Sequence, residues 1–227
     1  MILVYASLAA LVIFLGYWIY PILFPTIISY PWEKSPKKEN RTVIFAASYN
    51  PPHNGHLALL EYLTTRYTHV IAVIGFNPDK QYQVSPNARA DLLRKMVQEA
   101  LPVEAAAQIQ VEVVEGYIWR YAKKIGATLF FRGIRSWEKD GSDERTLQIL
   151  NTWGPMLLGP TTPIPTIYIE GNPKYNHVSS TLIRQICSSD DAAAEAQKAS
   201  SKSAVATTAL SELVPTSVSS TVADLYG

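Results

Sequence analysis

The chain has 227 residues, a length typical of one domain with short extensions. Hydrophobic residues make up 48%, enough for a core, and the formal net charge of +1 gives no strong field that would recruit nucleic acid. The single cysteine, Cys187, excludes an internal disulfide. The first 32 residues nevertheless differ in character from all that follow.

Residues 1–20 carry no charged side chain and have about the length that spans a bilayer. Basic residues come only after the apolar run, at Lys34, Lys37, Lys38 and Arg41. The positive-inside rule then predicts a single-pass membrane protein in which the domain that follows the apolar run faces the cytoplasm. A cleaved signal peptide and a buried core helix are the alternatives, and organellar targeting stays open.

From Thr42 onward, apolar and β-branched runs alternate with stretches of helical periodicity. The predicted strands are 42–47, 69–75, 111–115, 128–131 and 164–170. The predicted helices are 55–67, 85–101, 117–126, 143–152 and 179–186. Strands that alternate with helices predict βαβ units, and therefore an α/β fold with a five-stranded parallel sheet covered on both faces.

The last part of the chain changes composition. Residues 188–212 are rich in Ala and Ser and poor in aromatic residues, which predicts a flexible insertion. An apolar pattern returns in residues 213–227 and predicts a terminal helix. The predicted organisation is therefore a membrane anchor (1–32), a basic linker (33–41), the α/β domain (42–187), the insertion (188–212) and the C-terminal helix (213–227).

The loop Ser48–His56, with the sequence SYNPPHNGH, follows the first predicted strand. In open parallel sheets, ligands bind at the carboxyl ends of the strands, where this loop lies. The next helix begins near Gly55, so its free N–H groups and the positive end of its dipole face the loop, and His53 and His56 can donate to the same anion. The loop matches neither the Walker motif nor the dinucleotide fingerprint. It predicts a phosphate site, and a turn with two structural histidines is the alternative.

Three further strand-to-helix loops carry groups that suit phosphate. Arg132 and Arg135 flank a glycine after the fourth strand, and two guanidiniums at that spacing suit phosphate oxygens. Residues 179–181 offer hydroxyls and backbone N–H groups at a helix N-terminus, and Lys80 follows the second strand. Taken alone, the arginine pair is more often a solvated turn, residues 179–181 an N-cap, and Lys80 a surface lysine. Together, at one edge of the sheet, they predict a site for phosphorylated ligands.

With these loops in this order, the sequence resembles the nucleotidyltransferases that carry the H-x-G-H signature, and among them the bacterial-type phosphopantetheine adenylyltransferases. That family shows T-x-x-P-x-T/H-N-G-H, S-P-x-K, R-G-L-R and aromatic-x-x-I-S-S-S. Here the corresponding strings are SYNPPHNGH, NPDK, RGIR and YNHVSST. The resemblance covers roughly residues 42–187 and implies a Rossmann-like nucleotidyltransferase fold.

The resemblance implies an enzyme of coenzyme A biosynthesis that joins ATP and 4'-phosphopantetheine into dephospho-coenzyme A and releases pyrophosphate. Such enzymes position the reactants for in-line attack and form no covalent intermediate. Mg²⁺ would neutralise the leaving pyrophosphate. The implied partners are these small molecules and the membrane, with no nucleic acid, and because the bacterial relatives assemble as hexamers a homo-oligomer is also implied.

The resemblance also implies roles for individual residues. His56 and Lys80 would be catalytic, His56 by stabilising the transition state and Lys80 by steadying the α-phosphate. Pantetheine binding would use Ser48, Lys80, Ile118 and Arg132. The ATP site would comprise Ser48, Tyr49, His56, Gly133, Ile134, Arg135, Glu144, Tyr175, Asn176, His177, Val178, Ser179, Ser180 and Thr181.

The sequence departs from the family pattern at several positions. Ser48 and Asn50 stand where the family loop usually has threonine and aspartate. The stretch after RGIR is about three residues longer than in the family, so the ATP-contacting glutamate aligns with Glu144 or with Thr146 according to where the gap falls. A membrane anchor is not a feature of the bacterial enzymes.

Two other functions compete with this interpretation. Nicotinamide or nicotinate mononucleotide adenylyltransferases carry G-S-F-N-P-P-H-x-G-H and I-S-S-T-x-I-R, which SYNPPHNGH and VSSTLIR resemble, and Arg184 would then bind phosphate. The RGIR and NPDK loops favour phosphopantetheine. The second competing function is that of a catalytically inactive, membrane-tethered nucleotide sensor. Against it stands the presence of four candidate site residues: His56, Lys80, Arg132 and Arg135.

Overall fold

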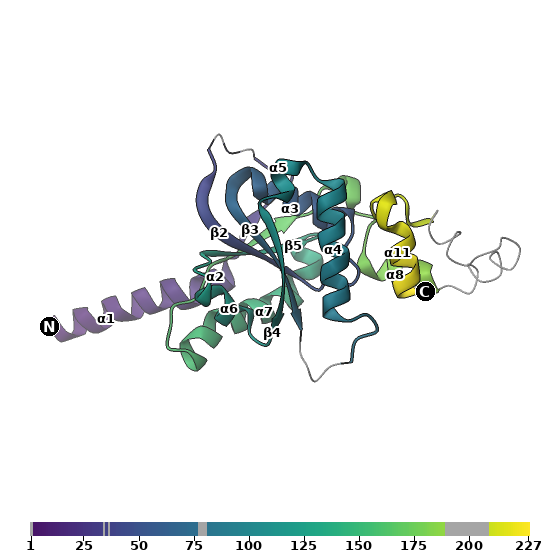
Figure 1. Cartoon of the computed structure of the whole chain (residues 1–227). Helices are drawn as coiled ribbons and strands as arrows, with labels where there is room; N and C mark the ends of the chain where they lie inside the picture. Colours follow the sequence, from purple (N-terminus) through teal and green to yellow (C-terminus); the bar gives the residue numbers. More distant parts are fainter. Residues whose placement is uncertain (1, 34, 36, 77–80, 189–208) are drawn as a thin grey trace, which may run out of the picture.

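The computed structural model describes residues 2–33, 35, 37–76, 81–188 and 209–227. A twisted parallel sheet lies between two layers of helices, α1 extends away from this body, and α11 lies beside α8 (Figure 1). Lys80 and most of the predicted insertion lie outside the described residues.

The sheet has six strands, and every neighbouring pair is parallel, in the order β1-β6-β5-β2-β3-β4. Their bounds are β1 Thr26–Ile28, β2 Glu39–Ala47, β3 Tyr67–Phe76, β4 Ile109–Glu115, β5 Leu129–Ile134 and β6 Thr166–Glu170. The parallel α/β architecture is confirmed, but the prediction of five strands is wrong. The extra strand, β1, comes from the N-terminal apolar run, where the β-branched sequence TII pairs with β6.

Helices connect the strands as the alternating pattern predicted. The α-helices of the domain are α3 Asn54–Arg66, α4 Pro86–Ala100, α5 Val103–Ala106, α6 Ile118–Lys124, α7 Trp137–Leu158, α8 Ser180–Ser188 and α11 Ser219–Tyr226, with 3-10 turns at Pro173–Tyr175 and Thr216–Val218. The start of α4 illustrates the local cause: the Ser85 hydroxyl accepts the N–H of Ala88 at 3.2 Å, and Pro86 occupies the first helical turn.

The two faces of the sheet bury different side chains. Val43, Phe45 and Ala72 pack on one face against α3, α4, α8 and α11, whereas Ile44 and Val73 pack on the other against α6. This alternation along single strands is what a central parallel sheet requires, because successive side chains point to opposite faces. Both cores therefore hold the carboxyl ends of the central strands in fixed positions.

The prediction of an N-terminal transmembrane helix is wrong. Of the helices within the described residues, not one combines the length and the apolar character that crossing a bilayer requires. The apolar run is divided into α1 (Ile2–Phe14), a π-helical turn (Leu15–Ile19), α2 (Tyr20–Leu23) and β1.

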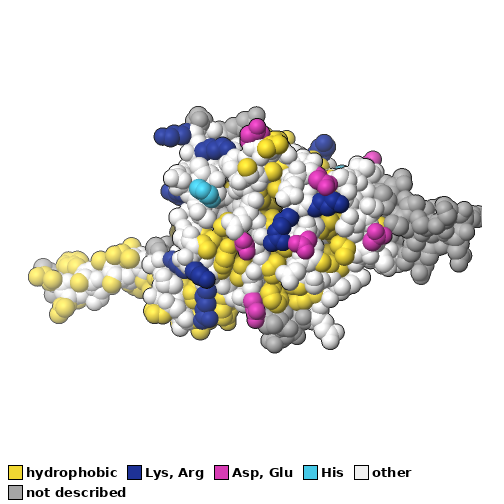
Figure 2. Space-filling view, viewed as in Figure 1, with side chains coloured by type: hydrophobic (Ala, Val, Ile, Leu, Met, Phe, Trp, Pro, Cys, Tyr) yellow, Lys and Arg dark blue, Asp and Glu magenta, His cyan; other side chains and the backbone are white. Residues whose placement is uncertain are grey.

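The predictions of cellular location and of membrane association also depend on a transmembrane helix. The single-pass location with a cytoplasmic catalytic domain is contradicted, and the predicted membrane association has no support in the structure. Figure 2 shows α1 as an apolar projection beside the domain surface. The residues after it contact the domain, since the Trp32 indole N–H donates to the carbonyl of Glu170 at 2.9 Å and Gln148 Nε2 donates to the carbonyl of Pro21.

Candidate active site

A cavity of about 500 Å³ opens at the carboxyl ends of β2, β5 and β6. Its walls come from the loop after β2, the first turns of α3 and α8, and the start of α7. Thirteen predicted site residues line it: Ser48, His56, Ile118, Arg132, Gly133, Ile134, Arg135, Glu144, Tyr175, Asn176, Val178, Ser179 and Ser180. The strand-end loops that the sequence placed at one edge therefore do meet there.

Some predicted residues lie elsewhere. Tyr49 is fully buried behind the cavity wall, and the side chains of His177 and Thr181 are exposed outside it. Lys80 falls outside the described residues, so its predicted role stays a prediction. The structure also adds Asp140, which was not predicted although it stands five residues after Arg135 in the first turn of a helix.

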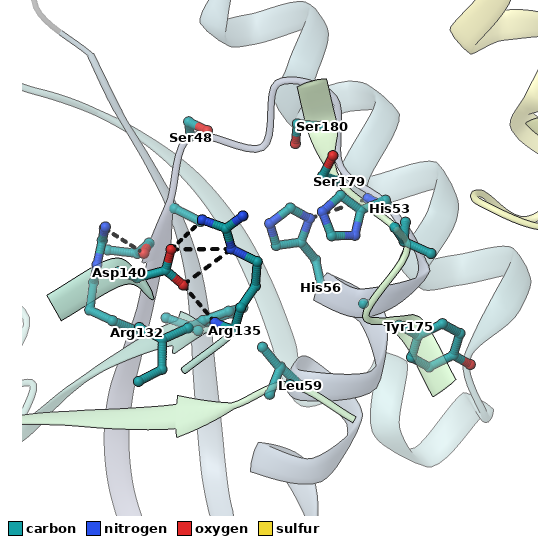
Figure 3. A pocket seen from close by; sticks show the side chains of 18 of the residues that line it. Ser48, His53, His56, Leu59, Arg132, Arg135, Asp140, Tyr175, Ser179 and Ser180 are labelled. Carbon is teal, nitrogen blue, oxygen red and sulfur yellow. Dashed lines mark hydrogen bonds and ion pairs between the residues drawn. The ribbon is translucent and has the colours of Figure 1, made fainter. Parts of the chain in front are cut away.

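The rings of His53 and His56 lie side by side at the start of α3, with ring centroids 3.8 Å apart (Figure 3). The backbone N–H of His53 donates to His56 Nδ1 at 3.2 Å. Because Nδ1 accepts, the proton of the neutral His56 ring lies on Nε2. The loop therefore selects the tautomer that leaves Nε2–H as the donor.

Burial keeps both imidazoles neutral at physiological pH. It lowers the pKa of His53 to about 4, and burial, together with the repulsion that a protonated His53 would exert, lowers the pKa of His56 well below its usual value. The two histidines form a capping box at the start of α3, in which the side chain of each faces the backbone N–H of the other.

Two glycines allow this close packing. A Cβ on Gly55 would lie 3.1 Å from the His53 ring, so glycine lets that ring fold over the helix N-terminus. A Cβ on Gly133 would lie 2.6 Å from Leu59 Cδ1, which is too short for any side chain. Gly133 therefore lets α3 approach the end of β5 and brings His56 near the arginine loop.

Arg132 is held by three hydrogen bonds. Its Nε and Nη2 donate to the two carboxylate oxygens of Glu144 at 2.8 and 2.6 Å, and Nη1 donates to the carbonyl of Ala46 at 3.0 Å. This planar, bidentate geometry is available to arginine and not to lysine. Glu144 is buried, whereas Thr146 is exposed and lines neither of the site's cavities. The geometry thus favours the alignment in which Glu144, and not Thr146, occupies the position of the family's ATP-contacting glutamate.

Arg135 pairs with Asp140 at the more open side of the cavity. The Arg135 backbone N–H donates to Asp140 Oδ2 at 2.7 Å, and its Nε and Nη2 donate to Oδ1. Burial alone would raise the pKa of Asp140, but the hydrogen bonds and charge of Arg135 lower it. The Arg135 side chain stays 63% exposed and can reach a ligand. Figure 3 shows this group and the histidine pair on opposite sides of the cavity.

A second cavity, of about 590 Å³, adjoins the first. The two share Ala46, Gly75, Ile118 and Arg132, and the second continues along α7 past Leu147, Leu150 and Asn151. The linings of both cavities are mostly apolar, but the first also carries two arginines, two histidines and two carboxylates, whereas Arg132 is the one charged side chain among the described residues that line the second. Arg132 therefore stands where a cavity with several charged groups meets one suited to a long and weakly charged group.

The described residues contain no group of three His, Cys, Asp or Glu side chains that could hold a metal ion. The two carboxylates that line the first cavity, Asp140 and Glu144, are both paired with arginines. These side chains do not form a protein cage for a divalent cation.

Comparison with known proteins agrees with this geometry. Residues 44–186 match the cytidylyltransferase-like family. The phosphopantetheine adenylyltransferase of Rhizobium meliloti (strain 1021) is 32% identical over 146 residues, which are 64% of this chain and 84% of the relative. That of Chromobacterium violaceum is 30% identical over 145 residues, or 63% and 80% of the two chains.

Among solved structures, the Plasmodium falciparum nicotinic acid mononucleotide adenylyltransferase complexed with NaAD aligns with a TM-score of 0.45 at 13% identity, covering 66% of this chain and 84% of that one. A likeness this weak decides nothing about the acceptor. The family match and the relatives at 30–32% identity do identify the family. The chain belongs to the cytidylyltransferase-like nucleotidyltransferases and, among them, to the phosphopantetheine adenylyltransferases.

Proposed function

We propose that this enzyme transfers the adenylyl group of ATP to 4'-phosphopantetheine, which gives dephospho-coenzyme A and pyrophosphate. The relatives that are named phosphopantetheine adenylyltransferase support this activity over most of their length. The single observation that carries it is the position of Arg132 between two cavities. A phosphate at that junction would place the nucleotide in one cavity and the uncharged pantetheine arm in the other.

The reaction needs one bond to form and one to break at the α-phosphorus. An oxygen of the acceptor phosphate attacks in line, the bridging oxygen to the β-phosphorus leaves, and pyrophosphate carries away the electron pair. His56 Nε2–H, which the His53 backbone N–H orients, would donate to a non-bridging oxygen as negative charge builds there. A neutral imidazole does this without losing or gaining a proton.

The rest of the chain's contribution is positioning and neutralisation of charge. Ser48, Arg132 and Arg135 all line the first cavity. Arg132 and Ser48 would bind the acceptor phosphate, and Arg135 would bind the β- and γ-phosphates. The free N–H groups at the start of α8 would bind a further phosphate oxygen, since helix N-termini favour anions. The Ser180 hydroxyl itself is occupied, because it donates to the carbonyl of Pro51 at 2.8 Å.

We propose that Mg²⁺ arrives bound to the triphosphate, since no group of three metal-binding side chains occurs in the part of the chain that the structure describes. When bound, it would neutralise charge on the departing pyrophosphate. Assembly into a homo-oligomer stays a prediction from the resemblance.

The alternative acceptor, a pyridine mononucleotide, requires Arg184 as a phosphate ligand. Arg184 instead donates to the backbone carbonyl of Asn50 and to the Thr181 hydroxyl, and it lines neither cavity. Because Arg184 lines neither cavity, whereas Arg132 lines both, the position of Arg184 supports phosphopantetheine as the acceptor.

The test is a product assay with the full-length chain. The enzyme receives ATP and Mg²⁺ with 4'-phosphopantetheine, nicotinamide mononucleotide or nicotinate mononucleotide in separate reactions, and products are identified by mass. We expect dephospho-coenzyme A alone. A pyridine dinucleotide as the main product would reject the proposal, and ATP binding without pyrophosphate release would favour the nucleotide sensor.

A His56→Ala variant tests the chemical step in the same assay. We expect turnover to fall by about 100-fold or more, the loss typical of a donor that stabilises transition-state charge. The dissociation constant of ATP should stay within a few fold, because His56 acts on the transition state. Unchanged turnover would remove His56 from the mechanism.

A further inference from the structure

The loop between β2 and α3, which carries Ser48 and leads to His56, is held by side chains from three other helices. Arg89 of α4 donates through Nη1 to the carbonyl of Ser48 at 2.8 Å. From α8, Arg184 donates to the carbonyl of Asn50, and from α11, the hydroxyl of Tyr226 donates to Asn50 Oδ1 at 2.9 Å. The loop's conformation thus depends on parts of the chain far from it in sequence.

The backbone of this loop needs such support. Tyr49 has φ 44°, in the left-handed region that a residue with a Cβ rarely adopts. A conformation of this kind persists only where the surroundings hold it. The Tyr49 ring is fully buried and lies 4.8 Å from the His56 ring, centroid to centroid. A shift at Tyr49 would therefore be felt directly at His56.

The C-terminal segment makes further contacts with the loop's end. The backbone N–H of Asn54 donates to the carbonyl of Leu213 at 3.0 Å, and its side-chain amide donates to the carbonyl of Glu212 at 3.1 Å. Tyr226 is only 1% exposed, and burial raises the pKa of its hydroxyl, which therefore stays protonated and can donate at any physiological pH. Neither Tyr226 nor Asn50 lines a cavity of the site.

We propose that Tyr226 is a positioning residue: its hydrogen bond to Asn50 holds the loop so that Ser48 and His56 keep their reactive geometry. The C-terminal helix α11 is then part of the construction of the active site, although it does not touch substrate. Small displacements of reacting groups cost far more in rate than in binding, so the loss should appear in kcat. The kinetic part of this proposal rests on the proposed function.

The first test is the full-length Tyr226→Phe variant, which removes one oxygen and keeps the ring. We expect kcat to fall about tenfold while the KM for ATP stays within about twofold, because misplaced groups slow the chemical step. Tyr62→Phe is the matched control. Tyr62 is also buried, at 6% exposure, its hydroxyl donates to the carbonyl of Glu33 at 3.5 Å, and it lines neither cavity. Equal kcat values for the two variants would overturn the proposal.

The second test asks whether the two residues act as a pair. Asn50→Ala removes the acceptor and keeps the backbone carbonyl that Arg184 binds. We expect Asn50→Ala and the double variant with Tyr226→Phe to be about as slow as Tyr226→Phe alone, since residues that act through one contact are not additive. Losses that multiply in the double variant would show independent roles and would overturn the pairing.

A third measurement does not depend on the substrate. Hydrogen–deuterium exchange of the peptide that covers residues 48–56 should be about tenfold faster in Tyr226→Phe than in wild type, with β3 unchanged. If the wild type makes no dephospho-coenzyme A, the proposed function fails and exchange alone decides the positioning role. If the wild type is active and the variant exchanges like it, only the positioning role fails.

Discussion

The histidine pair shows how burial at a single residue sets the chemistry of the site. Two buried imidazoles in close contact cannot both carry charge, so the protein holds them neutral and can use their N–H groups as donors. The sequence located both histidines from the H-x-G-H spacing. The tautomer could not be predicted, because it depends on a backbone N–H whose direction only the folded loop defines.

This neutrality has a consequence for stability. The unfolded chain binds a proton on His53 with a pKa near 6.5, whereas the folded chain does so only near pH 4. As pH falls below 6.5 the unfolded state gains protons first, so stability is lost progressively down to about pH 4. Between pH 7 and pH 5, we expect His53 to remove about 2 kcal/mol from the free energy of unfolding.

His53→Asn should abolish that part of the loss, because asparagine does not titrate. Urea unfolding at pH 7 and pH 5 measures both proteins. The wild type should lose about 2 kcal/mol more than the variant. Equal losses would mean that His53 is not held neutral by burial.

Arg132 supports a second prediction at the residue scale. Arg132→Lys keeps the charge but cannot bind both oxygens of Glu144 and a substrate phosphate together. We expect the KM for 4'-phosphopantetheine to rise about tenfold and the KM for ATP to change little, which corresponds to one lost charged hydrogen bond. Arg145→Lys is the control, since Arg145 lies on α7 next to Glu144 and lines neither cavity. A larger effect on the KM for ATP would mean that Arg132 binds the nucleotide and not the acceptor phosphate.

Among the secondary-structure elements, the N-terminal segment shows where sequence patterns are ambiguous. The five longer strands could be predicted because each is an apolar run between turn residues. The three residues of β1 could not, since they lie inside a longer apolar stretch and depend on pairing with β6. Hydropathy averaged over that stretch also misses the π-helical turn that interrupts it. The start of α7 at Trp137 was missed for a similar reason, because its first turn has no regular apolar stripe.

Truncation distinguishes the two parts of this segment. Deleting residues 2–12 removes only part of α1, which has no buried residue, so the free energy of unfolding should change by less than about 0.5 kcal/mol. Deleting residues 2–32 removes β1 and the Trp32 ring stacked on Tyr62, and should cost about 3 kcal/mol or more. Urea unfolding of the two truncated chains measures the difference. Equal stabilities would mean that β1 contributes nothing to the sheet.

At the scale of the whole molecule, the site depends on contacts that cross the fold. The sequence located the loops because the carboxyl ends of parallel strands must meet. It could not predict how α7 divides the space above the sheet into two cavities, since that division depends on which face of the helix turns inward. Glu144 fixes one side of Arg132, and Leu147, one turn later, lines only the second cavity.

That division predicts separable effects on the two substrates. Leu147→Trp would fill part of the second cavity, so the KM for 4'-phosphopantetheine should rise about tenfold, as expected when an apolar pocket loses room for its ligand. The dissociation constant of ATP, measured by calorimetry, should stay within about twofold because Leu147 does not line the first cavity. Leu157→Trp, on the same helix but lining neither cavity, should change neither value. If Leu147→Trp weakened both substrates equally, the two cavities would act as one site, and Arg132 would no longer mark a boundary between nucleotide and acceptor.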